Sequence, residues 1–126
     1  MKSNSILLLA LCVSLSFAGA SNVHPTGMFS DMFYSDESGD IGGTEIFIVL
    51  GDDNYWVVYQ EAEGAPTKPI IVKAEITANQ IKFILPKNEL HEELIFTGKI
   101  TEKALIGKFE GRDEKLKLPR KKSYWE

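Results

Sequence analysis

The chain has 126 residues and a formal net charge of −4, with only one cysteine. This length suits one small domain rather than two. A net-negative chain argues against nucleic acid as the main partner, because the phosphate backbone selects basic surfaces.

Residues 1–20 are predicted to be a cleaved signal peptide. Lys2 is the only charge, residues 6–13 are apolar, and Ala18 and Ala20 are the small residues that signal peptidase requires. The apolar part is much shorter than the roughly 20 residues that cross a bilayer, so no membrane span is expected. We therefore expect one mature domain over residues 21–126, in the periplasm or secreted.

Cys12 lies within the apolar stretch of this segment. A lipoprotein signal needs a small residue before its cysteine, whereas Leu11 stands here, so Cys12 is interpreted as an ordinary apolar residue. Lipidation, which would anchor the protein to a membrane, is the alternative. Without Cys12 the domain has no disulfide, and its core must suffice alone. This favours a bacterial exported protein over a eukaryotic extracellular module.

Charge is divided unevenly along the chain. Residues 21–63 contain nine acids and no Lys or Arg, whereas residues 64–126 contain thirteen basic residues and nine acids. Such asymmetry marks an interaction surface, or it reflects two ends of one fold that neutralise each other. We favour the second interpretation, because closing a sheet would set the acidic first strand beside the basic last one.

Short runs rich in β-branched and aromatic residues recur between turn-forming Gly, Asp, Asn and Pro. They predict eight strands: 27–34, 43–50, 55–62, 70–76, 80–85, 93–100, 105–110 and 115–118, the last resuming at 123–125. Only the link at 86–92 is long enough for a helical turn. Short links force neighbours to pair antiparallel, which predicts an all-β meander. Closure into a small barrel would remove the two exposed edges.

Apolar and polar residues alternate through the second half, as where Ile81 and Phe83 oppose Lys82. This pattern predicts one buried and one wet face. Gly98 and Gly107 are expected to face inward and let the sheet bend. The strands at 43–50 and 55–62 are apolar on both faces, so we expect the 86–92 loop, an N-terminal arm or a partner subunit to cover their outer side.

Two short motifs carry a family resemblance. Gly27-x-Phe29 resembles the Gly-x-Trp opening of the lipocalins, and Arg120 resembles their late arginine, which packs across that aromatic ring. The chain is thus similar to calycin-type, lipocalin-like barrels, which implies the architecture but no ligand-binding residue. It also resembles a family of small exported bacterial proteins in residues 43–46 and 123–125, which implies no activity.

No catalytic or metal-binding pattern stands out. His24 and His91 adjoin no serine in a recognised arrangement, and both are interpreted as solvated. The acidic turns at 36–40 and 51–54 lack EF-hand spacing and are interpreted as turn formers, with calcium as the alternative. The strand acids are expected to point outward, which leaves no carboxylate pair for glycoside hydrolysis. We predict no cofactor, no metal and no catalytic residue; a hydrolytic enzyme is the alternative.

The aromatic residues supply the remaining hypotheses. They are expected to fill the core first. We predict a non-enzymatic binding protein that takes a small apolar ligand in or at the barrel mouth. The candidate lining residues are Trp56, Val58, Phe83, Phe96 and Phe109. The alternative is a protein-interaction module or inhibitor, or a homodimer, that uses the outer face near residues 46–59. Its candidate contact residues are Phe47, Val49, Tyr55, Val57 and Tyr59.

Overall fold

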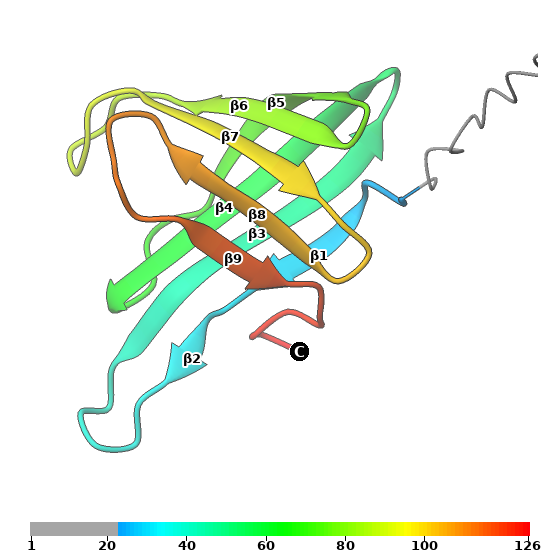
Figure 1. The fold of residues 1–126 in the computed structure, drawn as a ribbon. Helices are drawn as coiled ribbons and strands as arrows, with labels where there is room; N and C mark the ends of the chain where they lie inside the picture. The colour runs from blue at the N-terminus through cyan, green and yellow to red at the C-terminus, as the bar shows by residue number, and fades with distance from the viewer. Residues whose placement is uncertain (1–22) are drawn as a thin grey trace, which may run out of the picture.

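Tight turns bring each strand back against the one before it, which gives an antiparallel meander (Figure 1). The structure is a computed structural model that describes residues 23–126; the expected signal peptide and Cys12 lie outside this range. The strands are β1 (Gly27–Ser30), β2 (Phe33–Tyr34), β3 (Ile41–Gly51), β4 (Asn54–Gly64), β5 (Ile70–Thr77), β6 (Gln80–Leu85), β7 (Leu94–Ile100), β8 (Ala104–Phe109) and β9 (Leu116–Pro119).

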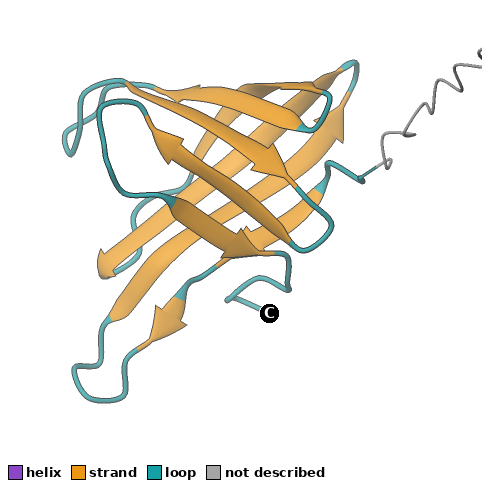
Figure 2. Ribbon diagram, viewed as in Figure 1, coloured by secondary structure: helices purple, strands orange, loops and turns teal. Residues whose placement is uncertain are grey.

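The strands form one sheet in the order β1-β3-β4-β5-β6-β7-β8-β9, with β2 paired to β3. The sheet is nearly closed into a barrel, and the predicted all-β meander is confirmed. Within residues 23–126 there is no helix (Figure 2). The long link instead turns on Asn88, whose side-chain oxygen accepts hydrogen bonds from the N–H groups of Leu90 and His91.

The first predicted strand is interrupted at Asp31 and Met32. The Asp31 carboxylate accepts a 2.7 Å hydrogen bond from the Thr44 N–H, and the Ser30 hydroxyl accepts one from the Met32 N–H. These side chains replace the backbone partners of a ladder. Gly43 opposite them has φ +101°, and a Cβ there would lie 2.7 Å from the Asp31 carbonyl oxygen, so only glycine fits.

The barrel closes between β1 and the residues after β9. Phe29 and Arg120 form an antiparallel bridge, and the Lys121 N–H donates to the Met28 carbonyl at 3.1 Å. Arg120 lies across the Phe29 ring, as the sequence predicts. The strands diverge beyond this point, so β2, the start of β3 and the turn between them extend past the closed part of the barrel as an arm (Figure 1). The start of β3 also pairs there with the end of β4.

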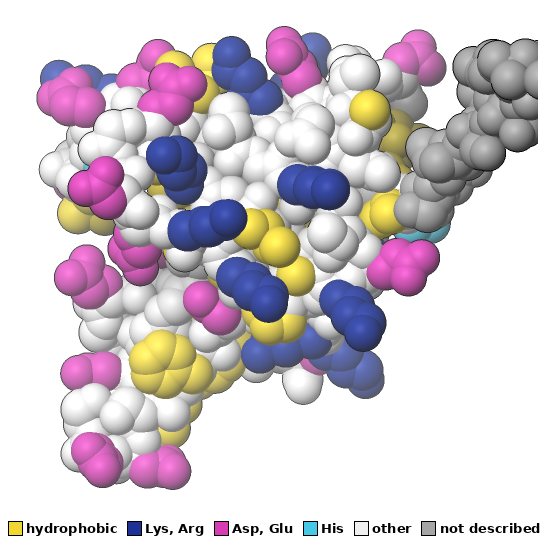
Figure 3. Space-filling view, in the orientation of Figure 1, with side chains coloured by type: hydrophobic (Ala, Val, Ile, Leu, Met, Phe, Trp, Pro, Cys, Tyr) yellow, Lys and Arg dark blue, Asp and Glu magenta, His cyan; other side chains and the backbone are white. Residues whose placement is uncertain are grey.

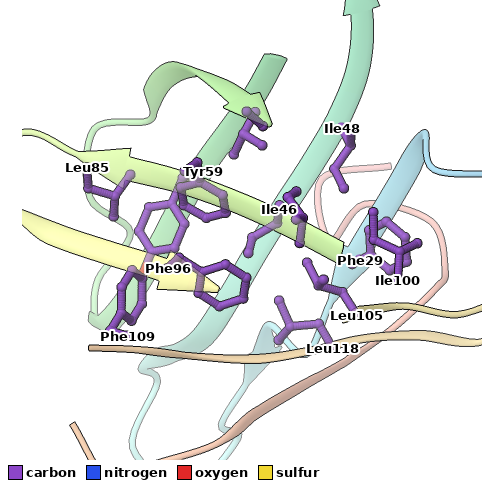
Figure 4. Packing of buried hydrophobic residues seen from close by; sticks show 14 residues of the cluster. Phe29, Ile46, Ile48, Tyr59, Leu85, Phe96, Ile100, Leu105, Phe109 and Leu118 are labelled. Atoms are coloured by element: carbon purple, nitrogen blue, oxygen red, sulfur yellow. The ribbon is translucent and has the colours of Figure 1, made fainter. Parts of the chain in front are cut away.

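A ladder of aromatic rings fills the interior toward one end of the barrel (Figure 4). Phe83 stacks on Phe96 at 4.8 Å between ring centroids, and Phe109 meets Phe96 edge-on at 5.3 Å. Tyr59 closes the cluster, 5.9 Å from Phe109. Aliphatic side chains fill the other end. The hydrophobic core cluster consists of Phe29, Ile46, Ile48, Val57, Tyr59, Ala74, Ile81, Phe83, Leu85, Phe96, Ile100, Leu105, Phe109 and Leu118.

Two glycines lie opposite each other beneath this ring cluster. Gly98 pairs with Gly107 across β7 and β8, and both face inward. A Cβ on Gly107 would lie 2.5 Å from the Phe96 ring and 2.8 Å from the Gly98 Cα. Their missing side chains therefore make the room that the Phe96 ring occupies.

The predicted facing of β4 is wrong by one residue. Val57 and Tyr59 are buried, whereas Trp56 and Val58 lie on the outer face. Both faces of this strand are apolar, so alternation alone does not reveal which side is buried. A shift of one residue moves the whole apolar set to the other face.

The outer face of β3 and β4 is partly covered by the C-terminal segment 123–126. This segment forms a turn rather than the predicted strand. Glu45, only 6% exposed, accepts hydrogen bonds from the hydroxyls of Ser30 and Ser123 and from the Tyr124 N–H. The Trp125 indole N–H donates to the Gln60 side-chain oxygen at 2.9 Å. We call this segment the C-terminal clasp.

Candidate functional site

One end of the barrel opens into a cleft of about 640 Å³. β3 and β4 are the longest strands, and their paired ends at Gly43 and Ala62 extend past the shorter strands to form one wall. The loops after β4, β6 and β8 supply the rest, including Leu90 and Arg112. We call this opening the mouth cleft.

The floor of the mouth cleft is apolar and aromatic. Tyr59 and Phe109, which belong to the ring cluster, separate it from the filled interior. Leu116 at the start of β9 and Ala62 on β4 adjoin them. These rings therefore close the cleft off from the interior of the barrel.

A buried hydrogen bond fixes the polar side of this floor. The Tyr59 hydroxyl donates to the Glu61 carboxylate at 2.9 Å. Burial raises the pKa of the Tyr59 phenol far above its usual range, and the Glu61 charge raises it further. The protonated Tyr59 hydroxyl thus holds the Glu61 carboxylate in place, and burial keeps it protonated well above the usual pKa of a phenol.

The mouth cleft carries charges of both signs. Arg112 lies 5.5 Å from the centroid of the Phe109 ring, and its charge opposes that of Glu61 at the Tyr59 hydroxyl. Within the described part of the chain, neither Arg112 nor Glu61 forms an ion pair. Asp31, Glu63 and Glu114 lie at the rim and make it mainly acidic. A cationic and an anionic group are thus both free to contact a ligand.

The side chains of both histidines make local hydrogen bonds. His91 lines the cleft, and its Nδ1 lies 2.7 Å from the Glu92 carbonyl oxygen. His24 lies in the segment before β1 and contacts the Thr26 hydroxyl. Among residues 23–126 no histidine pairs with a carboxylate, and no three potential ligands are grouped as a metal ion would need.

The predicted ligand-binding residues do not share one surface. Phe83, Phe96 and Phe109 belong to the ring cluster, and only Phe109 reaches the mouth cleft. Trp56 and Val58 lie on the outer face of β4, where the Lys73 ammonium lies over the Trp56 ring at 5.5 Å. The strand register therefore places three of the predicted ligand-binding residues inside the barrel and the other two on its outer face.

The predicted partner-facing residues are divided in the same way. Phe47 and Val49 lie outside on β3, but Val57 and Tyr59 are buried and cannot contact a partner. Tyr55 is half-buried and packs against the core. The strand pairing instead aligns four apolar side chains on the outer face, one each from β1, β3, β4 and β5. This outer apolar row consists of Met28, Phe47, Val58 and Ile71.

Glu61 and Arg112 are the cleft residues that sequence reasoning missed. Glu61 points inward because it pairs with the buried Thr44 and shares the face of Tyr59, whereas the strand acids were expected to point outward. The tight turn between β3 and β4 sets the register that pairs Glu61 with Thr44, so the inward direction of Glu61 could have been inferred from that turn. Arg112 lies in a loop, and no local pattern indicates that its side chain turns over Phe109.

No protein-family model matches the chain, and no similar curated protein or solved structure was found. None of the residues that the structure describes forms a helix long and apolar enough to cross a membrane.

Proposed function

We propose that this chain is a non-enzymatic, exported binding protein that takes a small amphiphilic molecule in the mouth cleft. The apolar body of the ligand would pack on the rings of Tyr59 and Phe109, and its polar head would meet Glu61 or Arg112. The observation that supports this most is an open cleft with a buried aromatic floor above a filled interior. Ligand pockets are typically concave and combine apolar surface with a few fixed polar groups. The mouth cleft has an aromatic floor, and its lining as a whole is more polar than apolar, which suits an amphiphilic ligand better than a purely apolar one.

The Glu61 carboxylate offers a fixed polar contact for such a ligand, because the Tyr59 hydroxyl holds it by a 2.9 Å hydrogen bond. The lipocalin-like resemblance agrees with a binding role as an analogy of architecture.

Native mass spectrometry of the protein purified from its own host tests this proposal. A retained small molecule, released on unfolding, is the expected result.

A second experiment uses two probes of opposite charge, 1-anilinonaphthalene-8-sulfonate and dodecyltrimethylammonium. Ala65→Trp, an exposed wall residue, should block both probes, whereas Arg112→Ala should weaken only the anionic one. Ile71→Ser on the outer face is the matched control and should bind like the wild type. Probes that bind Ala65→Trp unchanged would disprove a ligand site in the mouth cleft.

The outer apolar row supports a second candidate, a protein-interaction module. Ile71 is 66% exposed and Phe47 is 38% exposed, and they lie two strands apart in one row. Exposed apolar patches of this kind mark contact surfaces. Phe47→Ser with Ile71→Ser should abolish capture of a host protein that the wild-type protein retains, and should leave binding of both probes unchanged.

A further inference from the structure

Lysines cover the outer face of the sheet at β7, β8 and β9. Lys99 on β7, Lys108 on β8 and Lys117 on β9 all point outward and are exposed, and Lys82 on β6 lies at the margin. Figure 3 shows basic side chains spread over the face formed by β7, β8 and β9. We call the group of Lys99, Lys108 and Lys117 the lysine face.

The ladder sets these lysines in two staggered rows. Lys99 and Lys117 flank Ile106, and Lys82 and Lys108 flank Thr97. Lysines in one row are therefore two strand spacings apart, roughly 10 Å. This is close to the screening length of about 8 Å at physiological salt, so their potentials add over the face.

The acidic half of the chain has its own projecting element. The arm carries Asp36, Glu37 and Asp40 at its tip, all exposed, beside the exposed rings of Phe33 (56%) and Tyr34 (53%). Backbone hydrogen bonds between Ser35 and residues 39 and 40 order the tip. The tip is thus a fixed acidic and aromatic projection (Figure 1).

Within residues 23–126 no ion pair joins the acidic half of the chain to the basic half. The ion pair found in the described chain is Lys87–Glu92, and both of its residues lie in the 86–92 loop. The tip of the arm projects away from the barrel, while the lysine face lies on the barrel wall (Figure 3). Glu75, which pairs with Lys82 across the strands, is not within ion-pair distance of it. Closure of the barrel therefore leaves the charge asymmetry unpaired.

We infer that the lysine face binds the acidic arm of a second copy of this chain. Each molecule presents one arm and one lysine face on different parts of its surface, so the contact is heterologous and joins molecules head to tail. Charge complementarity would orient the encounter, and Phe33 and Tyr34 would supply apolar contact beside Ile106. The association is weak and depends on salt, because its ion pairs are exposed.

Sedimentation velocity of the purified protein over a range of concentrations tests the inference. The average mass should rise with concentration at about 0.01 M salt and return to that of a monomer at about 1 M, where the screening length is only about 3 Å. We would make an arm variant (Asp36→Asn, Glu37→Gln, Asp40→Asn) and a face variant (Lys99→Gln, Lys108→Gln, Lys117→Gln). Each should associate with itself about tenfold more weakly than the wild type, or not at all.

Mixing the two variants gives the sharper result. The arm variant retains a lysine face and the face variant retains an arm, so together they should form a one-to-one dimer that grows no further. A mixture that stays monomeric where the wild type associates would overturn the inference. The inference would also be overturned if both variants still associate and their association does not depend on salt concentration. That result would assign the contact to the outer apolar row. A wild type that stays monomeric but binds vesicles of anionic phospholipid would assign the lysine face to lipid instead.

Discussion

The guanidinium group of Arg120 lies over the ring of Phe29, with its central carbon 4.5 Å from the ring centroid. The same group donates hydrogen bonds to the carbonyl oxygens of Thr26 and His24 at 2.7 Å each, and to those of Thr101 and Glu102 at 3.1 Å. One side chain thus joins the segment before β1, the hairpin between β7 and β8, and the end of β9.

Arg120→Ala should lower the free energy of unfolding by about 2–3 kcal/mol, because the variant loses charged hydrogen bonds and a cation–π contact. Arg120→Lys should recover less than half of this, since an ammonium cannot reproduce the planar fork. Urea denaturation measures both values. Arg112→Ala, at an exposed arginine over another phenylalanine, is the control and should change stability by about 0.5 kcal/mol or less. An equally small loss for Arg120→Ala would show that the barrel closes without this residue.

Glu45→Gln should release the C-terminal clasp. The Glu45 carboxylate accepts three hydrogen bonds while almost fully buried, and an amide in its place presents a donor where two acceptors are needed. We expect a loss of about 1–2 kcal/mol and faster removal of Trp125 by carboxypeptidase. Glu63→Gln, at an exposed acid on the neighbouring strand, should leave both unchanged. Equal digestion of both variants would contradict a clasp that depends on Glu45.

Tyr59 should make the fold sensitive to alkali. Burial first, and then the Glu61 charge, raise the pKa of Tyr59 in the folded state above its unfolded value of about 10. Below pH 10 the phenol is protonated in both states, so its contribution to stability is fully present there. Above pH 10 the unfolded state alone loses the proton, so stability falls by about 1.4 kcal/mol for each pH unit from this group.

Tyr59→Phe should therefore flatten the fall in stability above pH 10, although it loses the hydrogen bond to Glu61 at every pH. Urea midpoints measured between about pH 7 and pH 11 check this. Tyr34→Phe, at an exposed tyrosine on the arm, should retain the wild-type pH dependence. Identical slopes for Tyr59→Phe and the wild type would contradict a raised pKa for Tyr59.

Gly107→Ala should destabilise the barrel by about 2–3 kcal/mol. A Cβ at this position would meet the Phe96 ring and the Gly98 backbone, so Phe96 must leave its stacked place against Phe83. Loss of near-ultraviolet circular dichroism from the ring cluster should accompany the lower stability. Thr97→Ala, on the outer face of β7, is the control with little expected effect. A Gly107→Ala protein of wild-type stability would mean that the cluster can repack.

The second half of the fold is readable from sequence because its two faces differ. In β6, Ile81, Phe83 and Leu85 are buried and Lys82 is exposed, as period-two alternation predicts. The same pattern places the inward residues of β5, β7, β8 and β9 correctly. Because one face of each strand is apolar and the other is charged, only the apolar face can point into the core.

The facing of β4 could be deduced from the turn that precedes it, though not from alternation. A two-residue turn at Asp52 and Asp53 pairs Gly51 with Asn54 and fixes every later pair, so Phe47 must lie opposite Val58. An exposed Phe47 is therefore incompatible with a buried Val58. The prediction that Phe47 and Val57 share the outer face breaks this geometric rule.

The mouth cleft and the C-terminal clasp could not be predicted from local sequence patterns, because segments far apart in the sequence form them. Ser123 reaches Glu45 across the sheet, and Arg112 turns over Phe109 from a loop without a repeating pattern. Propensity describes a strand or a turn, but it does not say which remote side chain a hydroxyl will meet. The break in the first predicted strand has a related cause, since the Asp31 side chain accepts a hydrogen bond from the Thr44 N–H, and Thr44 lies on β3.

The seam between β1 and the residues after β9 has a consequence for how the chain acquires its fold. The groups that lock it, Arg120 and Lys121, are synthesised after all nine strands. A nascent polypeptide that still lacks them has a free edge at β1 and an uncovered Phe29. We therefore expect the barrel to close only after residues 120 and 121 have left the ribosome.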